Sequence, residues 1–378
     1  MRNSPGPLLR RVMAGCSALA ALCVPGGLAT AAPGGPAADP PGFTERYQAL
    51  RHGGIVRAAN SSITCRAAAA LPAADPCLAA RAGRDAANDD FDMAYIDVDD
   101  DPNTYNSSRA HLDLPQGARV AYARLYWGGN LRAGEQKPPA DNGRVLFAEP
   151  GGSYRAVLAD TVARHTPDQG AAGGADAFQA SADVTALVRS SGPGLYTVAQ
   201  VNVAMGRSAA GAWGGWTLVV AYEKESEPLR RLALWDGFTA LAPVEERGRK
   251  RGGPDAGQTV RLPLAFPAGA GGQVGLVAYD GDRGRDGDSL TVSAGGGAAT
   301  ALSGAAGSAD DVLDSTIGGP GAQPWRIPAY ENTLGYDSDV LDLAPALRSG
   351  GDGLAFRLAS RQDAVWFGAL FAAVDATR

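Results

Sequence analysis

Carboxylates at alternate positions are the groups in this chain whose spacing most directly suggests chemistry. Asp97, Asp99, Asp101 and Asn103 occupy every second position, which turns hard oxygen ligands toward one side of an extended segment. Calcium is held by about six to eight such oxygens. Pro102 stands in the sixth place of the run, where an EF-hand loop requires Gly, so that loop is excluded. The run predicts either a calcium site of another kind or a polar turn that caps its own backbone.

A second acidic cluster lies among glycines that allow tight turns. Its carboxylates belong to Asp280, Asp282, Asp286 and Asp288. Packed together without a cation, these groups would repel one another unless Arg283 and Arg285 neutralise them. We therefore expect either a metal site, with calcium as the ion, or an exposed hairpin loop with its own salt bridges.

A repeated segment indicates the architecture. Residues 183–198 and 339–356 share an Asp, an apolar residue four places later, an Arg-Ser pair, a Gly turn and an alternating strand. Asp339 also belongs to a third acidic patch, with Asp337 and Asp342. Its place in the repeat favours a structural cap over a ligand. The repeat predicts a duplicated β-rich unit.

Two tryptophans next to glycines are the candidate ligand-binding residues. Trp213 and Trp216 bracket Gly214 and Gly215 ahead of an apolar strand. A Trp beside Gly can form a flat exposed platform on which sugar rings stack. It can also be a large core residue packed against a backbone that has no side chain, and we favour this second interpretation.

Signatures of catalysis are few. The three histidines, His52, His111 and His165, are far apart and lack metal-ligand spacing. Neither a nucleophile elbow nor a phosphate-binding loop is present in the sequence. The carboxylate pair of a glycosidase has a spacing that only the fold sets, so this alternative stays open. The sequence favours a protein without catalysis.

The N-terminus has the features of a signal peptide. Arginines precede an apolar stretch at residues 12–24, and an A-x-A pattern ends at Ala31. We expect residues 1–31 to be removed and the remainder to be secreted, with no membrane span after cleavage. Loss of the three arginines takes the formal charge from -6 to about -9, which argues against nucleic acid or an anionic membrane as a partner.

Cys65 and Cys77 are the cysteines that remain after cleavage. In an exported chain such a pair most simply forms a disulfide. A zinc site is the alternative, but two ligands without a nearby His do not complete a tetrahedral shell. The pair lies in residues 32–91, which we expect to be flexible and then irregular.

Many glycines and short alternating strands predict an all-β fold. After the signal peptide, the chain is long enough for two sandwich-sized units. We predict two related β-sandwich or jelly-roll units at residues 92–242 and 257–378. A polar linker loop, residues 243–256, is expected to join them, and the irregular disulfide-bearing segment precedes them.

Four motifs resemble a widespread family of exported bacterial surface proteins. They are Leu125-Tyr126-Trp127-Gly128-Gly129, Ala182-Asp183-Val184-Thr185, Gly214–Glu223 and Asp236-Gly237-Phe238. The resemblance covers the chain from about residue 92 onward. It implies an extracellular β-rich domain of unestablished function and carries over no catalytic residues. The Asp-Val-Thr segment is also similar to galactose-binding-like jelly rolls, which implies carbohydrate binding.

These observations predict a secreted surface or adhesion-type protein without catalysis, with calcium as a stabilising cofactor. The alternative is a carbohydrate-binding module or a glycosidase that acts on polysaccharide. The expected partner is an extracellular glycan or a protein surface.

Overall fold

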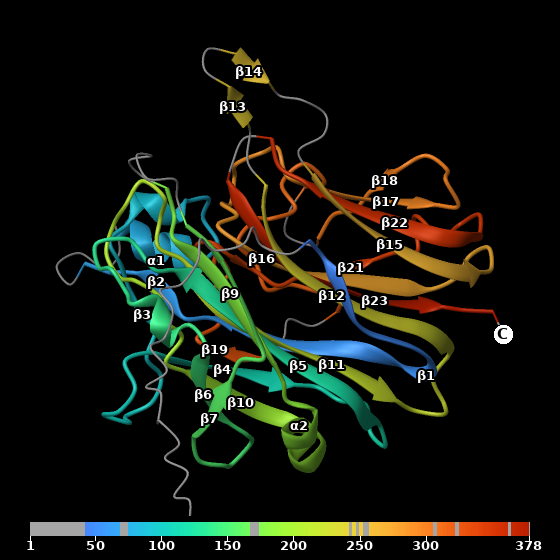
Figure 1. The fold of residues 1–378 in the computed structure, drawn as a ribbon, viewed down its shortest axis with the longest axis horizontal. Coiled ribbons are helices and arrows are strands. Elements are labelled where there is room, and N and C mark those ends of the chain that lie inside the picture. Colours follow the sequence, from blue (N-terminus) through green and yellow to red (C-terminus); the bar gives the residue numbers. More distant parts are fainter. Residues whose placement is uncertain are drawn as a thin grey trace, which may run out of the picture. The chain divides into compact units, whose positions relative to one another are not determined.

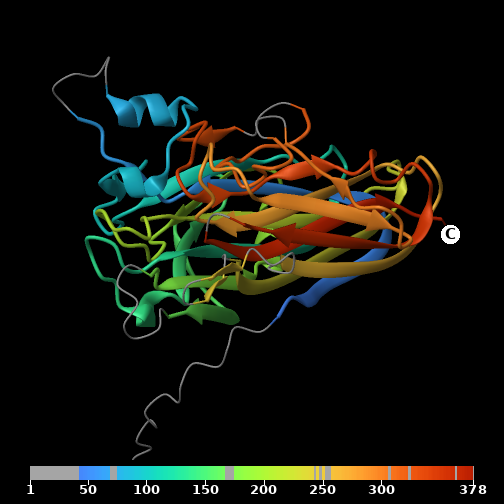
Figure 2. The same cartoon turned by 90° about the horizontal axis from the view of Figure 1, so that it is seen from above.

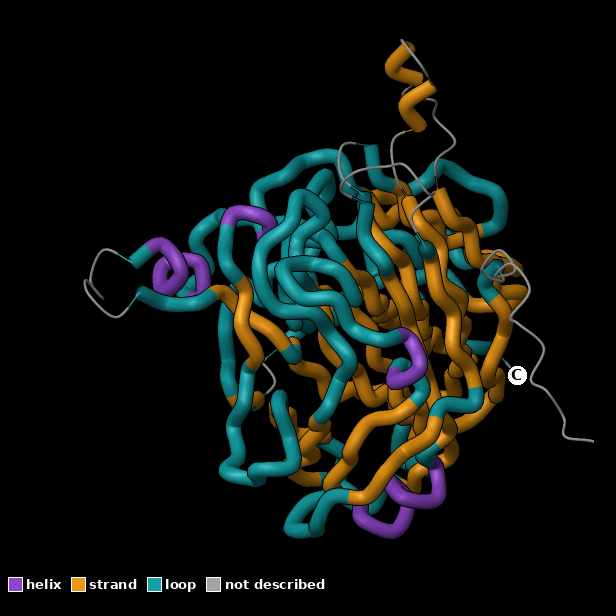
Figure 3. Tube along the Cα trace, turned by 60° about the vertical axis from the view of Figure 1, so that its left-hand side comes forward, coloured by secondary structure: helices purple, strands orange, loops and turns teal. Residues whose placement is uncertain are grey.

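Strands are the predominant regular structure and the helices are short (Figure 3). The computed structural model describes residues 42–68, 75–166, 174–241, 244–246, 249–251, 257–304, 308–321, 325–361 and 364–377. The predicted signal peptide and most of the predicted linker loop lie outside these residues. In the described part of the chain, no helix has the length and apolar character needed to cross a membrane.

The first jelly roll takes eight strands from the N-terminal half of the chain. They are β1 (Thr44–Ser61), β4 (Ser107–Leu112), β5 (Arg119–Asn130), β6 (Arg144–Ala148), β7 (Arg155–Leu158), β9 (Ala177–Asp183), β10 (Gly194–Ala199) and β11 (Gly214–Glu223). One sheet has the order β1-β11-β5-β9 and the other β4-β10-β6-β7. Counted along the chain, these orders are 1-8-3-6 and 2-7-4-5, which is the jelly-roll topology. Two further strands, β8 (Thr161–His165) and β19 (Arg326–Ile327), pair with β9 and β4.

The second jelly roll repeats this topology (Figure 1, yellow to red). Its strands are β12 (Leu229–Leu241), β15 (Gly257–Phe266), β16 (Gly272–Tyr279), β17 (Ser289–Ala294), β18 (Thr300–Ala301), β20 (Tyr336–Asp337), β21 (Val340–Asp342), β22 (Gly351–Ala359) and β23 (Val365–Asp375). One sheet has the order β12-β23-β16, with β20 and β21 both on the free side of β16, and the other has β15-β22-β17-β18. With β20 and β21 counted as one interrupted strand, the orders are again 1-8-3-6 and 2-7-4-5. The prediction of two related jelly-roll units is confirmed, but their predicted bounds, residues 92–242 and 257–378, are not: the first roll begins with β1, and β12 belongs to the second roll.

The strand β1 joins the two rolls. Residues 44–52 pair with β12, and residues 53–61 pair with β11, so one hydrogen-bonded sheet runs through both rolls. The change of partner occurs at Gly53, which has a φ of 153°. A Cβ there would lie 2.0 Å from the carbonyl oxygen of Tyr222, so only glycine fits. The sequence did not predict this strand, because residues 32–91 were expected to be irregular.

The sheet that runs through both rolls has an inner part in each roll, and both faces of each part are covered. One face packs on the second, outer sheet of its own roll and forms a core, around Trp127 in the first roll and Leu276 in the second. The other faces of the two inner parts meet in a third core between the rolls, which contains Tyr126 and Tyr279. Gln179 crosses this core: its Nε2 donates to the carbonyl oxygens of Gly237 at 2.9 Å and Gly368 at 3.0 Å.

The position of a strand in this arrangement explains its sequence pattern. In the outer strand β15, every second residue from Val260 to Phe266 is buried and the residues between them are exposed, because one face meets solvent. The inner strands β11 and β23 are buried along almost their whole length, and their sequences are nearly continuous apolar runs. The alternation therefore identifies the outer sheets, and the continuous runs identify the inner ones.

An insertion between β1 and β4 carries the disulfide. It contains β2 (Ile63–Cys65), α1 (Pro76–Arg81), a 3-10 turn at Asn88–Asp90 and β3 (Met93–Tyr95), and its helix lies at the left-hand end in Figure 2. Cys65 and Cys77 are bonded, as predicted, with their Cα atoms 5.6 Å apart. Elsewhere are a 3-10 turn at Pro139–Asp141, the helix α2 (Thr185–Ser191) and a small hairpin of β13 (Val244–Glu246) and β14 (Arg249–Arg251).

Candidate metal centre

Three buried carboxylates meet at the edge of the second roll. Asp337 ends β20, Asp339 precedes β21, and Asp314 lies in the segment at residues 308–321 that follows β18. One oxygen from each lies within 4.8 Å of the others, and no other such acidic group occurs in the described ranges. All three side chains are buried, Asp337 completely. We call this set the carboxylate triad.

Backbone hydrogen bonds bring the segment and the strand edge together. The amide of Ser338 donates to the carbonyl oxygen of Thr316 at 2.9 Å, and the amide of Val340 donates to that of Gly318 at 3.1 Å. Residues 316–318 therefore lie along the edge formed by β20 and β21. This arrangement carries Asp314 to the two aspartates of the strand edge, although more than twenty residues separate them.

Thr316 is the main hydrogen-bond donor to the triad. Its amide donates to Asp337 Oδ1 at 3.1 Å. Its hydroxyl lies 2.6 Å from Asp314 Oδ1 and 3.1 Å from both oxygens of Asp339. A hydroxyl has one proton, so it can serve only one of these three oxygens at a time. The amide of Gly318 donates to Asp339 Oδ1 at 2.5 Å.

Two oxygens of the triad are buried and have no hydrogen-bond donor in the described ranges of the chain. They are Asp337 Oδ2 and Asp314 Oδ2. Arg283 Nη2 lies 3.9 Å from Asp314 Oδ2, which is a long ion pair and not a hydrogen bond. A buried carboxylate oxygen left without a donor is destabilising, because it has lost its water and gained no partner. These oxygens are what a bound cation would contact.

Two arginines nearby offset only part of the negative charge. Arg57 Nη2, from β1 of the first roll, donates to the carbonyl oxygen of Gly318 at 2.5 Å. Arg326 Nη2 donates to the carbonyl oxygen of Tyr330 at 2.5 Å. Burial lowers the pKa of both guanidinium groups to about 10. In the described part of the chain, neither forms an ion pair with the triad.

Burial raises the pKa of every carboxyl group in the triad. For Asp337 the pKa lies well above the ordinary value, through burial and then repulsion from Asp339 and Asp314. Burial and the charge of Asp314 raise the pKa of Asp339 to about 7, and burial also raises that of Asp314. The neighbouring Asp311 follows the same trend, with a pKa raised by burial to about 6. The site therefore disfavours the charged forms unless a cation is present.

The arrangement can hold a hard divalent cation. Calcium–oxygen distances in proteins are about 2.4 Å, so three oxygens within 4.8 Å of one another need only small side-chain movements to contact one ion. Aspartate oxygens are calcium and magnesium ligands, and a threonine hydroxyl or water can complete the shell.

The sequence assigned Asp339 to the wrong role. In the first roll, Asp183 Oδ1 accepts the amide of Thr185 at 2.8 Å. The matching cap in the second roll is Asp342, whose Oδ1 accepts the amide of Ala344 at 2.9 Å. The repeat is therefore aligned three residues further along than the sequence suggested, and Asp339 is not the repeated cap.

The cross-strand register supports the new alignment. Asp183 lies opposite Arg124 on β5, and Asp342 lies opposite Gln273 on β16. With these pairs matched, Phe178 opposite Gly129 corresponds to Asp337 opposite Ala278. The residue that corresponds to Asp339 is then Ala180, which packs in the core of the first roll. Asp337 and Asp339 thus occupy positions that are apolar in the first roll.

The structure does not bring the carboxylates of the first predicted calcium run together. Asp99 Oδ1 accepts the amide of Asp101 and the hydroxyl of Thr104, both at 3.0 Å. Asp101 Oδ1 accepts the amide of Asn103 at 3.0 Å, and Asp97 Oδ1 accepts the Ser107 hydroxyl at 2.7 Å. These oxygens cap their own turn, which is the alternative that the sequence left open.

The second predicted cluster lies beside the triad. Asp280 and Asp282 are buried, and each accepts the side-chain amide of Asn88, at 2.9 and 3.0 Å. Asp288 is buried and its charge contributes to the raised pKa of Asp337, whereas Asp286 is exposed. Among the described residues, these four aspartates form no group of three close oxygens of their own. Asp314 was missed, and the acidic run at residues 310–314 was its only signal in the sequence.

Of the two interpretations of the tryptophans beside glycines, the structure supports the core one that we favoured and contradicts the exposed sugar platform. Trp213 and Trp216 are completely buried. Trp213 lies in the third core, between the rolls, and Trp216 lies in the core of the first roll. Trp216 Nε1 donates to the Ser108 hydroxyl at 2.8 Å. Both indoles are core residues, so neither offers a surface to a sugar.

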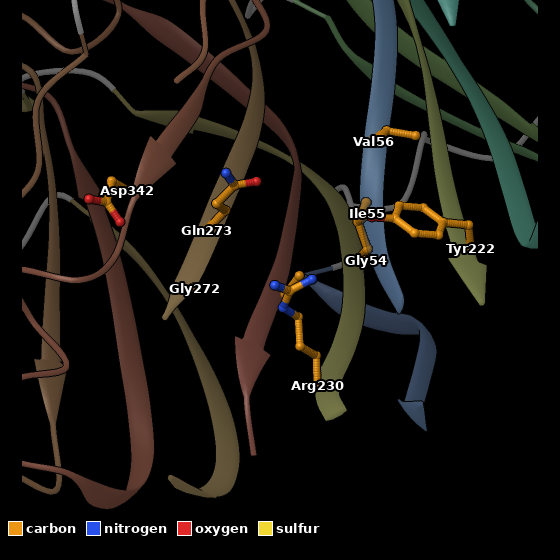
Figure 4. Close-up of a pocket in the computed structure, with 9 residues that line it drawn as sticks. Gly54, Ile55, Val56, Tyr222, Arg230, Gly272, Gln273 and Asp342 are labelled. Carbon is orange, nitrogen blue, oxygen red and sulfur yellow. The ribbon is translucent and has the colours of Figure 1, made fainter. Parts of the chain in front are cut away.

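A pocket of about 310 Å³ lies at the bend of β1, between Gly54 and Gln273 (Figure 4). Its arginine is already occupied: Arg230 Nε donates to Asp375 at 3.0 Å, and Nη1 donates to the Gly53 carbonyl oxygen at 2.8 Å. Asp342, which also lines the pocket, is the backbone cap described above, because its Oδ1 accepts the amide of Ala344. The polar groups here maintain the fold, so this pocket is a weaker candidate than the triad.

Comparisons with known proteins do not identify a family. No family model matches the chain, and no curated protein matches it. Among solved structures, the chain is similar to one from the Sulfolobus turreted icosahedral virus, at 10% identity, a TM-score of 0.22, and coverage of 70% of this chain and 86% of the other. It is also similar to the major capsid protein P2 of bacteriophage PM2, at 11% identity, a TM-score of 0.18, and coverage of 86% and 98%. Similarities this low carry no functional argument.

Proposed function

We propose that the protein is a secreted, non-catalytic surface or adhesion-type protein whose second jelly roll is completed by a calcium ion at the carboxylate triad. The observation that carries this proposal is the buried Asp337 Oδ2, which has no hydrogen-bond donor and lies in a group with Asp314 and Asp339. A cation would give this oxygen a partner and would offset the repulsion within the triad.

The disulfide supports an extracellular location. The bond between Cys65 and Cys77 closes a short insertion, and such bonds persist in oxidising compartments. Extracellular modules bind calcium with dissociation constants of about 0.1–1 mM, because their surroundings supply the ion. The predicted signal peptide and the resemblance to exported surface proteins point to the same compartment.

Calcium fits the site better than magnesium. The triad places carboxylate oxygens at unequal distances, 2.6 and 3.1 Å, from one threonine hydroxyl. Calcium accepts such flexible geometry, whereas magnesium demands a near-ideal octahedron and keeps several waters. The carbohydrate alternative has lost its predicted residues, since both tryptophans are buried.

Calorimetric titration of EDTA-treated protein tests the proposal. Calcium should bind at one site per chain, and an Asp337→Asn variant should not bind it. Asp342→Asn is the matched control, because Asp342 is an exposed cap outside the triad and asparagine keeps its accepting oxygen. Absence of calcium binding to the native protein, or equal binding to Asp337→Asn, would overturn the cation site. Fractionation of the producing cells tests location separately: the proposal expects oxidised protein outside the cytoplasm.

A further inference from the structure

A second candidate site lies where the first half of β1 meets the start of β5. It is a cleft of about 470 Å³, and its polar lining comes from β1, β5, β11 and α2. The lining residues that matter here are Tyr47, Arg51, Arg119, Arg189 and Glu223. We call this feature the arginine cleft. None of its residues belongs to the carboxylate triad.

The arginine cleft carries excess positive charge on an acidic protein. Three guanidinium groups and one carboxylate leave a net charge of +2, whereas the whole chain has a formal charge of -6. Arg51 Nε donates to Glu223 Oε1 at 3.1 Å, and Arg119 donates to the other oxygen of the same carboxylate. One carboxylate thus lies between two guanidinium groups and cannot neutralise both.

Arg189 adds a charge that no carboxylate offsets. Its Nε donates to the carbonyl oxygen of Val120 and its Nη2 to that of Ala121, both at 3.1 Å. In the described ranges it forms no ion pair with an acidic side chain. The two carbonyl bonds fix the side chain in place, so this guanidinium is held at the cleft before any ligand arrives.

An aromatic ring stands beside these charges. Tyr47 lines the cleft, and its ring stacks on that of Tyr122 with centroids 4.9 Å apart and an angle of 5° between the planes. Both rings are partly exposed, in contrast to the buried tryptophans. An aromatic face held in this way can pack against the apolar face of a sugar ring.

We propose that the arginine cleft binds an anionic saccharide. Guanidinium groups recognise carboxylate, sulfate and phosphate through paired hydrogen bonds, and Tyr47 would contact the sugar ring that carries the acidic group. The cleft has the volume of a typical small-molecule site. The chain as a whole is acidic, so a locally positive cleft is the place where an anionic ligand is expected to bind.

Binding measurements on the full mature chain test this inference. Oligogalacturonate is the anionic probe, a neutral maltooligosaccharide of equal length is the uncharged one, and polyglutamate is an acidic chain without sugar rings. We expect saturable binding of oligogalacturonate that weakens as salt is added, and no binding of the neutral probe.

Three variants separate the contributions. Arg51→Gln combined with Arg119→Gln should weaken oligogalacturonate binding about tenfold or more, since hydrogen bonds to charged groups are lost. Tyr47→Leu should weaken binding of oligogalacturonate but not of polyglutamate. Arg155→Gln is the matched control, because Arg155 is an exposed arginine on β7 that pairs with Glu149. Unchanged melting temperatures in these variants show that the fold is retained.

Each outcome decides the inference. Loss of binding in the double arginine variant, with native binding in Arg155→Gln, supports it. Equal binding in the double variant, or no binding of oligogalacturonate to the native protein, overturns the site. Polyglutamate binding that is as tight as oligogalacturonate binding and insensitive to Tyr47→Leu overturns the assignment to a saccharide.

Discussion

Replacement of Asp337 by asparagine should have opposite effects on stability with and without calcium. Asparagine preserves the size of the side chain and the oxygen that accepts the Thr316 amide. It removes one negative charge from a position with no exposure to solvent. In EDTA we therefore expect Asp337→Asn to be more stable than the native protein. In calcium we expect it to be less stable, because a ligand of the ion is lost.

The magnitudes follow from the protonation and binding equilibria. Protonating a carboxyl group of ordinary pKa, about 3.9, at about pH 7.5 costs about 5 kcal/mol. This is the upper limit of the gain for Asp337→Asn in EDTA, because burial and the neighbouring carboxylates raise the pKa of Asp337 and disfavour its charged form in the folded protein. Calcium at about one hundred times its dissociation constant stabilises the native protein by about 2.7 kcal/mol, and the variant should lose this.

Thermal unfolding monitored by circular dichroism is the appropriate assay. At about 2–4 °C per kcal/mol for units of this size, calcium should raise the melting temperature of the native protein by roughly 5–10 °C. Asp342→Asn should respond to calcium as the native protein does. The reasoning fails if Asp337→Asn is less stable than the native protein in EDTA, because the carboxylate would then be stabilising by itself.

Three further predictions concern the fold. Reduction of the Cys65–Cys77 bond, which spans twelve positions, should lower the free energy of unfolding by about 3 kcal/mol, measured by urea denaturation with and without reductant. Gly53→Ala should prevent folding or lower stability severely, because the added Cβ would clash with backbone atoms. Gly117→Ala is the control: Gly117 has a φ of 78° and open space around it, so the substitution should lower the free energy of unfolding by only about 1 kcal/mol in the same assay. In EDTA, acidification from about pH 7.5 to 5 should raise the melting temperature. The pKa of Asp339 in the folded protein is about 7, so the folded state takes up a proton in this range and the unfolded state does not. A fall in the melting temperature would contradict this pKa shift. Saturating calcium should abolish this rise.

Strands could be predicted from the sequence in two cases: an alternating pattern marks a strand with one face in solvent, and a continuous apolar run marks a strand with both faces buried. The alternation in β15 and the apolar runs in β11 and β23 each indicate a strand. β1 lacks both patterns, because its first half carries charged residues and its bend contains Gly53 and Gly54, which are typical of a turn. Its strand conformation depends on β11 and β12, which lie far along the sequence.

The candidate metal centre was harder to predict than the fold. Asp337 and Asp339 were visible as an acidic patch, but an acidic patch in sequence is usually solvated. Burial comes from the segment around Thr316, which carries Asp314 to the strand edge and has no strand pattern of its own. The Asp97 run had the clearer spacing, yet its oxygens are used by its own turn. The regular spacing of the Asp97 run thus belongs to a turn. The metal centre is instead assembled by the tertiary fold from residues that are distant in the sequence.

The duplication itself supplies the strongest argument that the triad has a ligand. At matched positions of the two rolls, Phe178 and Ala180 are buried in the core of the first roll, while Asp337 and Asp339 are buried in the second. Apolar residues at these positions satisfy the topology at no electrostatic cost. Carboxylates at the same positions destabilise the roll unless something compensates them, and Asp337 Oδ2 has no donor among the residues that the structure describes. The jelly-roll fold thus does not require an acidic pair at these positions, because the first roll has an apolar pair there. We infer that a cation, bound by the acidic pair together with Asp314, compensates the buried charge.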